Sequence, residues 1–175
     1  MNIEPNKQGA SSKKGLRIPE IRRVLVVTDF AEPASRAVEY AYSLLPRGGT
    51  VRILHLAKPF EFSNPVHASH PDAAHRLELE RMRQWNDCHA RLRALIPAGA
   101  DGRGIRTEVE VCSENNPAIA ICQAAASFGA DLICMASHGK YGIAKSFLGS
   151  VTESVMNRSP TPVLIIGPGV HRSAQ

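Results

Sequence analysis

Residues 130–166 read ADLICMASHGKYGIAKSFLGSVTESVMNRSPTPVLII, and this stretch sets the class of fold. Residues 131–135 and 162–166 are short apolar runs, the pattern of strands buried on both faces. Between them, glycines and small polar residues lead to Ser150, where a helical pattern begins. A strand, a helix and a second strand in this order predict a parallel unit, because a helix is the usual connection between parallel neighbours.

The preceding sequence repeats this alternation. Residues 24–27 (VLVV) predict a buried strand that ends in Thr28 and Asp29, and residues 51–57 (VRILHLA) predict the next one. Apolar residues at three- and four-residue spacing between the two strands predict a helix that begins near Pro33.

A third strand is expected at residues 105–112. Asn116 and Pro117 then open a helix, as an N-cap and a first helical residue, and Gly129 ends it. Alternating strands and helices predict an α/β fold with an open five-stranded parallel sheet, doubly wound. Ligands bind such sheets at the carboxyl ends of the strands.

The middle of the chain is less regular. Residues 58–74 hold three prolines and no periodic apolar face, which predicts a long loop. Residues 75–96 predict a charged helix with one apolar stripe. That stripe consists of Leu79, Met82, Trp85, His89, Leu92 and Leu95.

Length and composition indicate a single domain. The chain has 175 residues, 43% of them hydrophobic, and this length is typical of one globular unit. Residues 1–20 are polar and predict a disordered arm, residues 21–168 the domain, and residues 169–175 a tail. The four cysteines form no CxxC pair, and no signal peptide or long apolar segment is evident, so we expect a cytoplasmic protein without a membrane span.

The formal net charge of +5 predicts attraction to anions. The basic residues are dispersed, and aromatic residues amount to 5% of the chain, so the stacking platforms of nucleic-acid-binding proteins are missing from the sequence. We therefore expect a small phosphate compound and no nucleic acid.

A phosphate site is expected between residues 139 and 151. Gly139 and Gly149 allow close approach of the backbone to a ligand, and the N-terminus of the helix at Ser150 favours an anion. The alternative is that Ser150 and Glu153 form a capping box with no ligand role. Residues 139–146 approach a Walker A loop, but Ala144 replaces its second glycine and the loop follows the fourth strand, which argues against a P-loop.

Three segments, VVTDF at 26–30, ILHLA at 53–57 and the stretch 130–166, resemble the universal stress protein family, and the resemblance extends over about residues 21–168. The ATP-binding branch of that family carries G-x-x-G, nine residues, and G-[S/T]. This sequence has Ala136 to Gly139, the nine residues 140–148, and Gly149 with Ser150. The spacing agrees, and Ala136 replaces the first glycine.

The resemblance implies an adenine-nucleotide α-hydrolase-like, Rossmann-like fold and a regulatory or stress-response module that binds ATP, with Mg²⁺ on its phosphates. The resemblance implies residues that contact the base and ribose, line the adenine pocket and hold the phosphates. They are Thr28, Asp29, Leu56, Met135, Ala136, His138, Gly139, Gly149, Ser150 and Val151. Lys140 and Lys145 are candidates to neutralise phosphate charge. The alternative for Asp29 is to cap the following helix.

The last strand, residues 162–166, is short and apolar and is expected at a sheet edge, where a second subunit would protect it. A homodimer through this strand is therefore expected, and the resemblance implies the same edge. Two other functions stay open: a family member that binds no nucleotide, because of Ala136, and a slow ATP-hydrolysing enzyme. No Ser/His/Asp or paired-carboxylate site can be assembled from the sequence, so we expect at most weak ATPase activity.

Two further groups are candidate sites. His67, His70 and His75, with His55, have the residue type of a metal site, but a proline-rich loop is an unusual place for one. Cys112, Cys122 and Cys134 are expected as small core residues, and Cys88, on the charged helix, is a candidate redox sensor.

Overall fold

The computed structural model describes residues 18–57, 72–137 and 148–167. The predicted tail, most of the predicted arm and most of the predicted loop at 58–74 lie outside the described residues. The end of that loop is different from the prediction, because a helix begins at Ala73.

Five parallel strands form one sheet, in the order β3-β2-β1-β4-β5. The strands are β1 (Arg23–Val27), β2 (Thr50–Ala57), β3 (Arg106–Ser113), β4 (Leu132–Ala136) and β5 (Val163–Ile166). The predicted doubly wound α/β sheet is confirmed. The direction of winding reverses between β1 and β4, so their carboxyl ends flank the switch point of the sheet.

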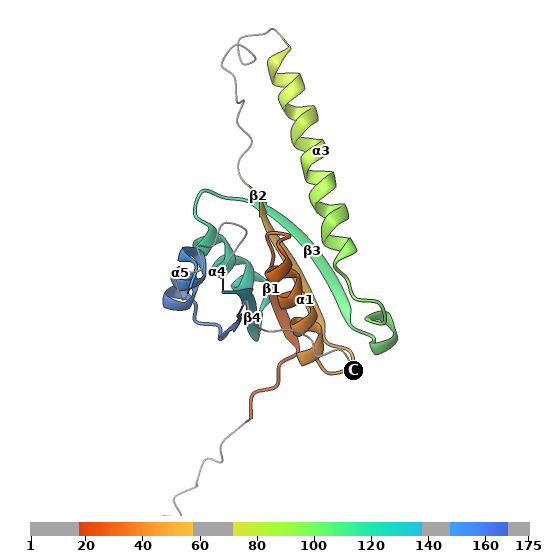
Figure 1. Cartoon of the computed structure of the whole chain (residues 1–175), viewed down its shortest axis with the longest axis vertical. Helices are drawn as coiled ribbons and strands as arrows, with labels where there is room; N and C mark the ends of the chain where they lie inside the picture. The colour runs from red at the N-terminus through yellow and green to blue at the C-terminus, as the bar shows by residue number, and fades with distance from the viewer. Residues whose placement is uncertain (1–17, 58–71, 138–147, 168–175) are drawn as a thin grey trace, which may run out of the picture.

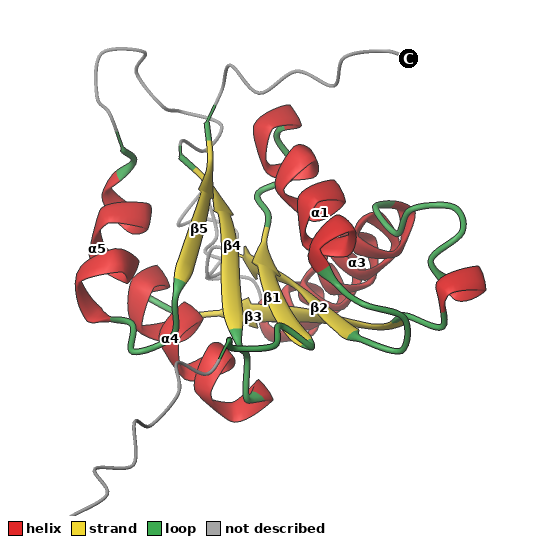
Figure 2. Cartoon of the chain, turned by 90° about the horizontal axis from the view of Figure 1, so that it is seen from below, coloured by secondary structure: helices red, strands yellow, loops and turns green. Residues whose placement is uncertain are grey.

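Helices cover both faces of the sheet, with α1 and α3 on one side and α4 and α5 on the other (Figure 2). Their bounds are α1 (Glu32–Leu44), α3 (Ala73–Ala94), α4 (Pro117–Phe128) and α5 (Ser150–Arg158), and a short 3₁₀ helix, η1 (Asp101–Arg103), precedes β3. The predicted ends of α4 are confirmed. The Asn116 side chain accepts a hydrogen bond from the Ile119 N–H, and Gly129 ends the helix at a φ of 65°.

The sheet separates two apolar layers, as the two-residue period of a strand requires. On β1, Val24 and Val26 point into the layer beneath α1 and α3, while Leu25 points into the layer beneath α4 and α5. All three side chains are fully buried. The residues that follow β1 are therefore attached to a strand that is packed on both faces.

The predicted apolar stripe of α3 is only partly buried. Leu92 is fully buried, whereas Leu79, Met82 and Trp85 are 42%, 55% and 44% exposed. The N-terminal part of α3 extends beyond the sheet (Figure 1), so the upper stripe has no strand beneath it. Cys88 packs in the same core cluster as Leu92 and is buried, although it is not part of the predicted stripe.

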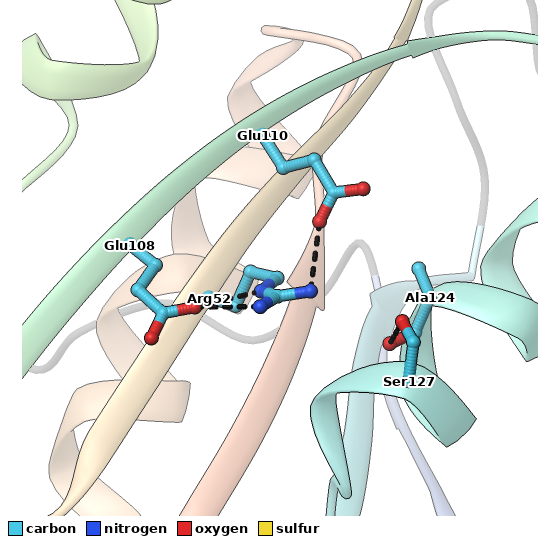
Figure 3. Close-up of polar contacts among 5 residues, drawn as sticks. All are labelled: Arg52, Glu108, Glu110, Ala124 and Ser127. Carbon is cyan, nitrogen blue, oxygen red and sulfur yellow. Dashed lines mark hydrogen bonds and ion pairs between the residues drawn. The ribbon is translucent and has the colours of Figure 1, made fainter.

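Charged residues occupy the α4 side of β2 and β3. The Arg52 guanidinium donates to the carboxylates of Glu108 and Glu110 on the neighbouring strand, at 2.7 to 2.9 Å (Figure 3). It also lies 4.4 Å from the ring centre of Phe128 at the end of α4. This paired cation forms the border of the apolar layer beneath α4.

Candidate functional site

Residues named from the sequence gather at one edge of the sheet. Thr28 and Asp29 directly follow β1, while Met135 and Ala136 end β4, the strand that pairs with β1. Leu56 lies within β2, one residue before its end. The α/β architecture therefore brings segments more than 100 residues apart to the switch point, where ligands bind in sheets of this kind.

The turn after β1 is fixed by the polar groups of Thr28, a residue that is 3% exposed. Its N–H donates to the Leu54 carbonyl at 2.9 Å, and its Oγ1 accepts from the Phe30 N–H at 3.1 Å. Its carbonyl accepts from Nδ1 of His55 at 2.9 Å, so the proton of that contact belongs to the imidazole. Burial lowers the pKa of His55, which favours the neutral ring.

Asp29 stabilises the same turn and does not cap α1. Its Oδ1 accepts a hydrogen bond from the Ala31 N–H at 3.0 Å. The helix begins at Glu32 with Ala31 as its N-cap, and no side chain supplies a cap hydrogen bond there. The alternative reading of Asp29 as a helix cap is therefore wrong. The carboxylate stands at the end of a central strand, half-buried.

The end of β4 is tied to the beginning of α5. The Ser137 carbonyl accepts from the Gly149 N–H at 2.7 Å, and the Ala136 carbonyl accepts from Oγ1 of Thr152 at 3.1 Å. The Ser137 N–H donates to the Ile166 carbonyl of β5 at 2.9 Å. The first turn of α5 is thus held directly beside the carboxyl end of β4.

Gly149, and not Ser150, is the N-cap of α5, so the capping box given as the alternative for Ser150 and Glu153 does not form. Ser150 is the first helical residue, and no side-chain hydrogen bond caps the helix. The first helical hydrogen bond runs from the Glu153 N–H to the Gly149 carbonyl, at 2.9 Å. The N–H groups of Ser150, Val151 and Thr152 precede it, and such groups have no acceptor within a helix. The positive end of the α5 dipole lies at the same place.

Ala136 has an ordinary strand conformation. Within the described residues, Phe30 alone among non-glycine residues has a positive φ. Alanine at 136 therefore carries none of the backbone cost that a left-handed position would impose. Its side chain and that of Met135 are 9% and 4% exposed.

Thr152, whose buried hydroxyl ties α5 to β4, was not predicted from the sequence. Its signal is a β-branched hydroxyl residue in the first turn of a helix, too common a feature to single it out. We expect Thr152→Val to lower the free energy of unfolding by about 1 to 2 kcal/mol, because it removes a buried hydrogen bond while keeping the side-chain shape.

Urea denaturation measures this loss, and Thr161→Val is the matched control. The Thr161 hydroxyl makes no hydrogen bond within the described residues, so its removal should cost less than about 0.5 kcal/mol. Equal losses in the two variants would show that the Thr152 hydrogen bond contributes nothing.

Some predicted site residues lie outside the described part of the chain. His138 and Gly139 do so, as do Lys140 and Lys145. Of the predicted histidine group, His67 and His70 lie outside it as well, and His75 lies in α3. Within the described residues, no group of three or more His, Cys, Asp or Glu side chains is arranged to hold a metal ion. None of the described helices is both long and apolar enough to span a membrane.

The cysteines differ from the prediction in one respect. Cys134 is fully buried as expected, and Cys112 and Cys122 are half-buried at the edge of the core. Cys88, the candidate redox sensor, is 6% exposed, and burial raises the pKa of its thiol. A buried thiol that stays protonated is a poor redox sensor, so this reading of Cys88 is not supported.

Labelling with a disulfide reagent at pH 8 should therefore leave Cys88 and Cys134 unreacted in the folded protein. Burial raises the pKa of Cys134 to about 12, so its reactive thiolate is scarce at pH 8. All four cysteines should react in 8 M urea, about the upper end of a routine unfolding series, which provides the control. Rapid reaction of Cys88 in the native protein would restore it as a candidate sensor.

The comparisons with known proteins agree with this architecture. A sequence model described as the universal stress protein family matches residues 20–167. A universal stress protein of Thermus aquaticus is 27% identical over 146 residues, which cover 83% of this chain and 98% of that protein. Universal stress protein MJ0577 of Methanocaldococcus jannaschii is 50% identical over a stretch of 38 residues, 22% of this chain and 24% of that protein.

Two solved structures are also similar. The structure of MJ0577 matches this chain with a TM-score of 0.71 and 22% sequence identity. The match covers 87% of this chain and 100% of the MJ0577 chain. The structure of a universal stress protein in complex with cAMP matches with a TM-score of 0.52 and 25% sequence identity. That match covers 85% of this chain and 98% of the other chain. Because the family model extends from before β1 to the residue after β5, the chain belongs to the universal stress protein family.

Proposed function

We propose that this protein binds an adenine nucleotide, ATP, at the carboxyl ends of β1, β2 and β4, and acts as a regulatory or stress-response module. One observation carries the proposal: the turn at Thr28 and Asp29 follows β1, and the N-terminus of α5 is held at the end of β4, the strand that pairs with β1 at the switch point of the sheet. A polar strand end for the base and ribose therefore lies beside a helix end for the phosphates.

The phosphates are assigned to the first turn of α5. The N–H groups of Ser150 and Val151 precede the first helical hydrogen bond, and the Ser150 hydroxyl is on the exposed side of the helix. Gly149 presents no side chain, which allows phosphate oxygens to approach these groups closely. His138 and Gly139 belong to the same proposed contact by their place in the motif.

The base and ribose are assigned to the β1 and β2 ends. Leu56 and Met135 belong to the apolar layer on the α4 and α5 side of the sheet. Their apolar side chains are suited to pack beside an adenine ring. The Asp29 carboxylate would supply an oxygen ligand to Mg²⁺, a hard cation that keeps several waters. Ala136 adds one methyl group in a strand conformation, which carries no left-handed backbone cost. A relative solved with cAMP supports an adenine nucleotide as the ligand class.

Isothermal titration calorimetry with ATP, ADP, AMP and cAMP tests the proposal. We expect saturable heat with ATP, and mass spectrometry of the purified protein checks for nucleotide that remains bound. The absence of both, with ATP at about 1 mM, would exclude ATP as a ligand of meaningful affinity, because binding weaker than this corresponds to less than about 4 kcal/mol.

We also propose a homodimer formed through the edge of β5. The carbonyls of Pro162 and Ile166 face β4, so the two-residue period of the strand places the Ile165 N–H on the outer edge. Proline is tolerated at an edge strand when its missing N–H points away from the sheet. Ile165→Pro should therefore yield a folded monomer in light scattering, and a persistent dimer would show that another surface holds the subunits.

A further inference from the structure

Phe30 occupies a strained position in the turn after β1. Its φ is 64°, and it is the one non-glycine residue with a positive φ in the part of the chain that the structure describes. For an L-residue with a side chain, this region carries a population penalty of roughly fivefold to thirtyfold. Such a conformation persists only where the surroundings enforce it, and strain of this kind is concentrated at functional sites.

Hydrogen bonds enforce one part of this conformation. The Phe30 N–H donates to Oγ1 of Thr28 at 3.1 Å, and the next N–H, of Ala31, donates to Oδ1 of Asp29 at 3.0 Å. The side chains of Thr28 and Asp29 therefore hold the turn, and the turn in return fixes these two side chains. A change at Phe30 would move the residues assigned to the nucleotide.

Two other elements hold the ring of Phe30. The His55 imidazole on β2 lies 4.3 Å from it, between ring centres, and is itself fixed by its hydrogen bond to the Thr28 carbonyl. The Arg91 guanidinium on α3 lies 3.9 Å from the centre of the Phe30 ring. This distance is within the range of a cation–π contact.

Arg91 has a weak alternative partner on its own helix. Its guanidinium lies 3.9 Å from the Asp87 carboxylate, and both side chains are more than half exposed. Exposed pairs of this kind contribute little. The ring contact with Phe30 is the better defined of the two, and it joins α3 to the turn after β1. The buried neighbours Cys88 and Leu92 hold this part of α3 against the sheet.

We propose that Arg91 is a positioning residue for the nucleotide site: its guanidinium, packed on the Phe30 ring, keeps Phe30 in the left-handed conformation that fixes Thr28 and Asp29. The assignment to nucleotide binding rests on the function proposed above. The effect on the turn does not. Arg91 acts through Phe30 and is not assigned a contact with the nucleotide.

The test compares Arg91→Met with Arg81→Met, a control at an exposed arginine on the same helix. Methionine keeps an unbranched apolar chain and removes the cation. The first measurement is amide hydrogen exchange at Phe30 and Ala31, which needs no nucleotide. We expect about three- to fivefold faster exchange in Arg91→Met, the size of a weak cation–π contact, and no change in Arg81→Met.

The second measurement is the ATP dissociation constant, which should rise about three- to fivefold in Arg91→Met only. A variant with Phe30→Gly removes both the ring and the strain, so adding Arg91→Met to it should change neither exchange nor affinity. A merely structural Arg91 would give the same effect with and without the ring.

The outcomes separate the two proposals. Wild-type protein that binds no ATP would overturn the proposed function, while faster exchange in Arg91→Met would still support the link between α3 and the turn. Unchanged exchange at Phe30 and Ala31 in Arg91→Met would overturn the positioning role, even if wild-type protein binds ATP. Faster exchange with unaltered ATP affinity would overturn the role of this link in binding.

Discussion

Replacing Gly149 with valine is expected to abolish ATP binding while leaving the sheet folded. The backbone at Gly149 is extended, with φ −69° and ψ 149°, a conformation that β-branched residues adopt readily. The hydrogen bond from its N–H to the Ser137 carbonyl can therefore persist. The valine side chain would occupy the space in front of the first turn of α5, where the phosphates are assigned. We expect the ATP dissociation constant to rise at least about a hundredfold, or about 2.7 kcal/mol.

Gly102→Val is the matched control for this variant. Gly102 lies in η1, away from the site, and a Cβ built on it meets no heavy atom within 4 Å. This variant should bind ATP as the wild type does. Calorimetry measures both affinities, and far-ultraviolet circular dichroism checks the fold. Unaltered affinity in Gly149→Val would remove the α5 N-terminus from the phosphate site, and loss of the fold would show that Gly149 serves the structure instead.

Local signals in the sequence predicted the fold well. Asn116 and Gly129 mark the two ends of α4 because an N-cap side chain and a left-handed glycine act within a few residues. The β1 run VLVV predicted a buried strand because residues buried on both faces need no polar alternation. Such features depend on neighbouring residues alone.

Features that depend on contact between distant segments could not be predicted in this way. An apolar stripe was predicted along α3, and its residues Leu79 and Met82 are exposed. The N-terminal part of α3 extends beyond the sheet, and no periodic pattern encodes where a strand ends beneath a helix. The capping box, the alternative at Ser150, does not form because Gly149, anchored to Ser137, is the N-cap, and the helix begins at Ser150 as predicted.

At the candidate site too, some features could be predicted from the sequence, and contacts between distant segments could not. The order of elements predicted that the strand ends at Thr28 and Asp29 and at Ala136 would lie at the same end of the sheet, and they do. The contact of Arg91 with Phe30 joins residues 61 positions apart and could not be predicted, because a charged residue on a helix usually faces solvent. Sequence reasoning thus predicted which strand ends lie together, but not the contacts that hold the turn after β1 in shape.

The largest expected loss of stability is at Leu25. This side chain is fully buried at the centre of the sheet, on a strand paired with both β2 and β4, and it packs in the layer beneath α4 and α5. Leu25→Ala removes the buried methyl groups and leaves a cavity that rigid neighbours on both sides cannot fill. We expect the free energy of unfolding to fall by about 3 to 4 kcal/mol.

Leu44→Ala, at the end of α1, is the control, because that side chain is 40% exposed and its loss should cost less than about 1 kcal/mol. Urea denaturation should move the midpoint of Leu25→Ala to a lower concentration while the slope stays constant, since the surface exposed on unfolding hardly changes. Leu25 lies below the site and not in it, so the variant that remains folded should bind ATP with wild-type affinity. Weaker binding by folded Leu25→Ala would mean that the central strand adjusts to the cavity, and that the carboxyl end of β1 is not the rigid base on which the nucleotide site depends.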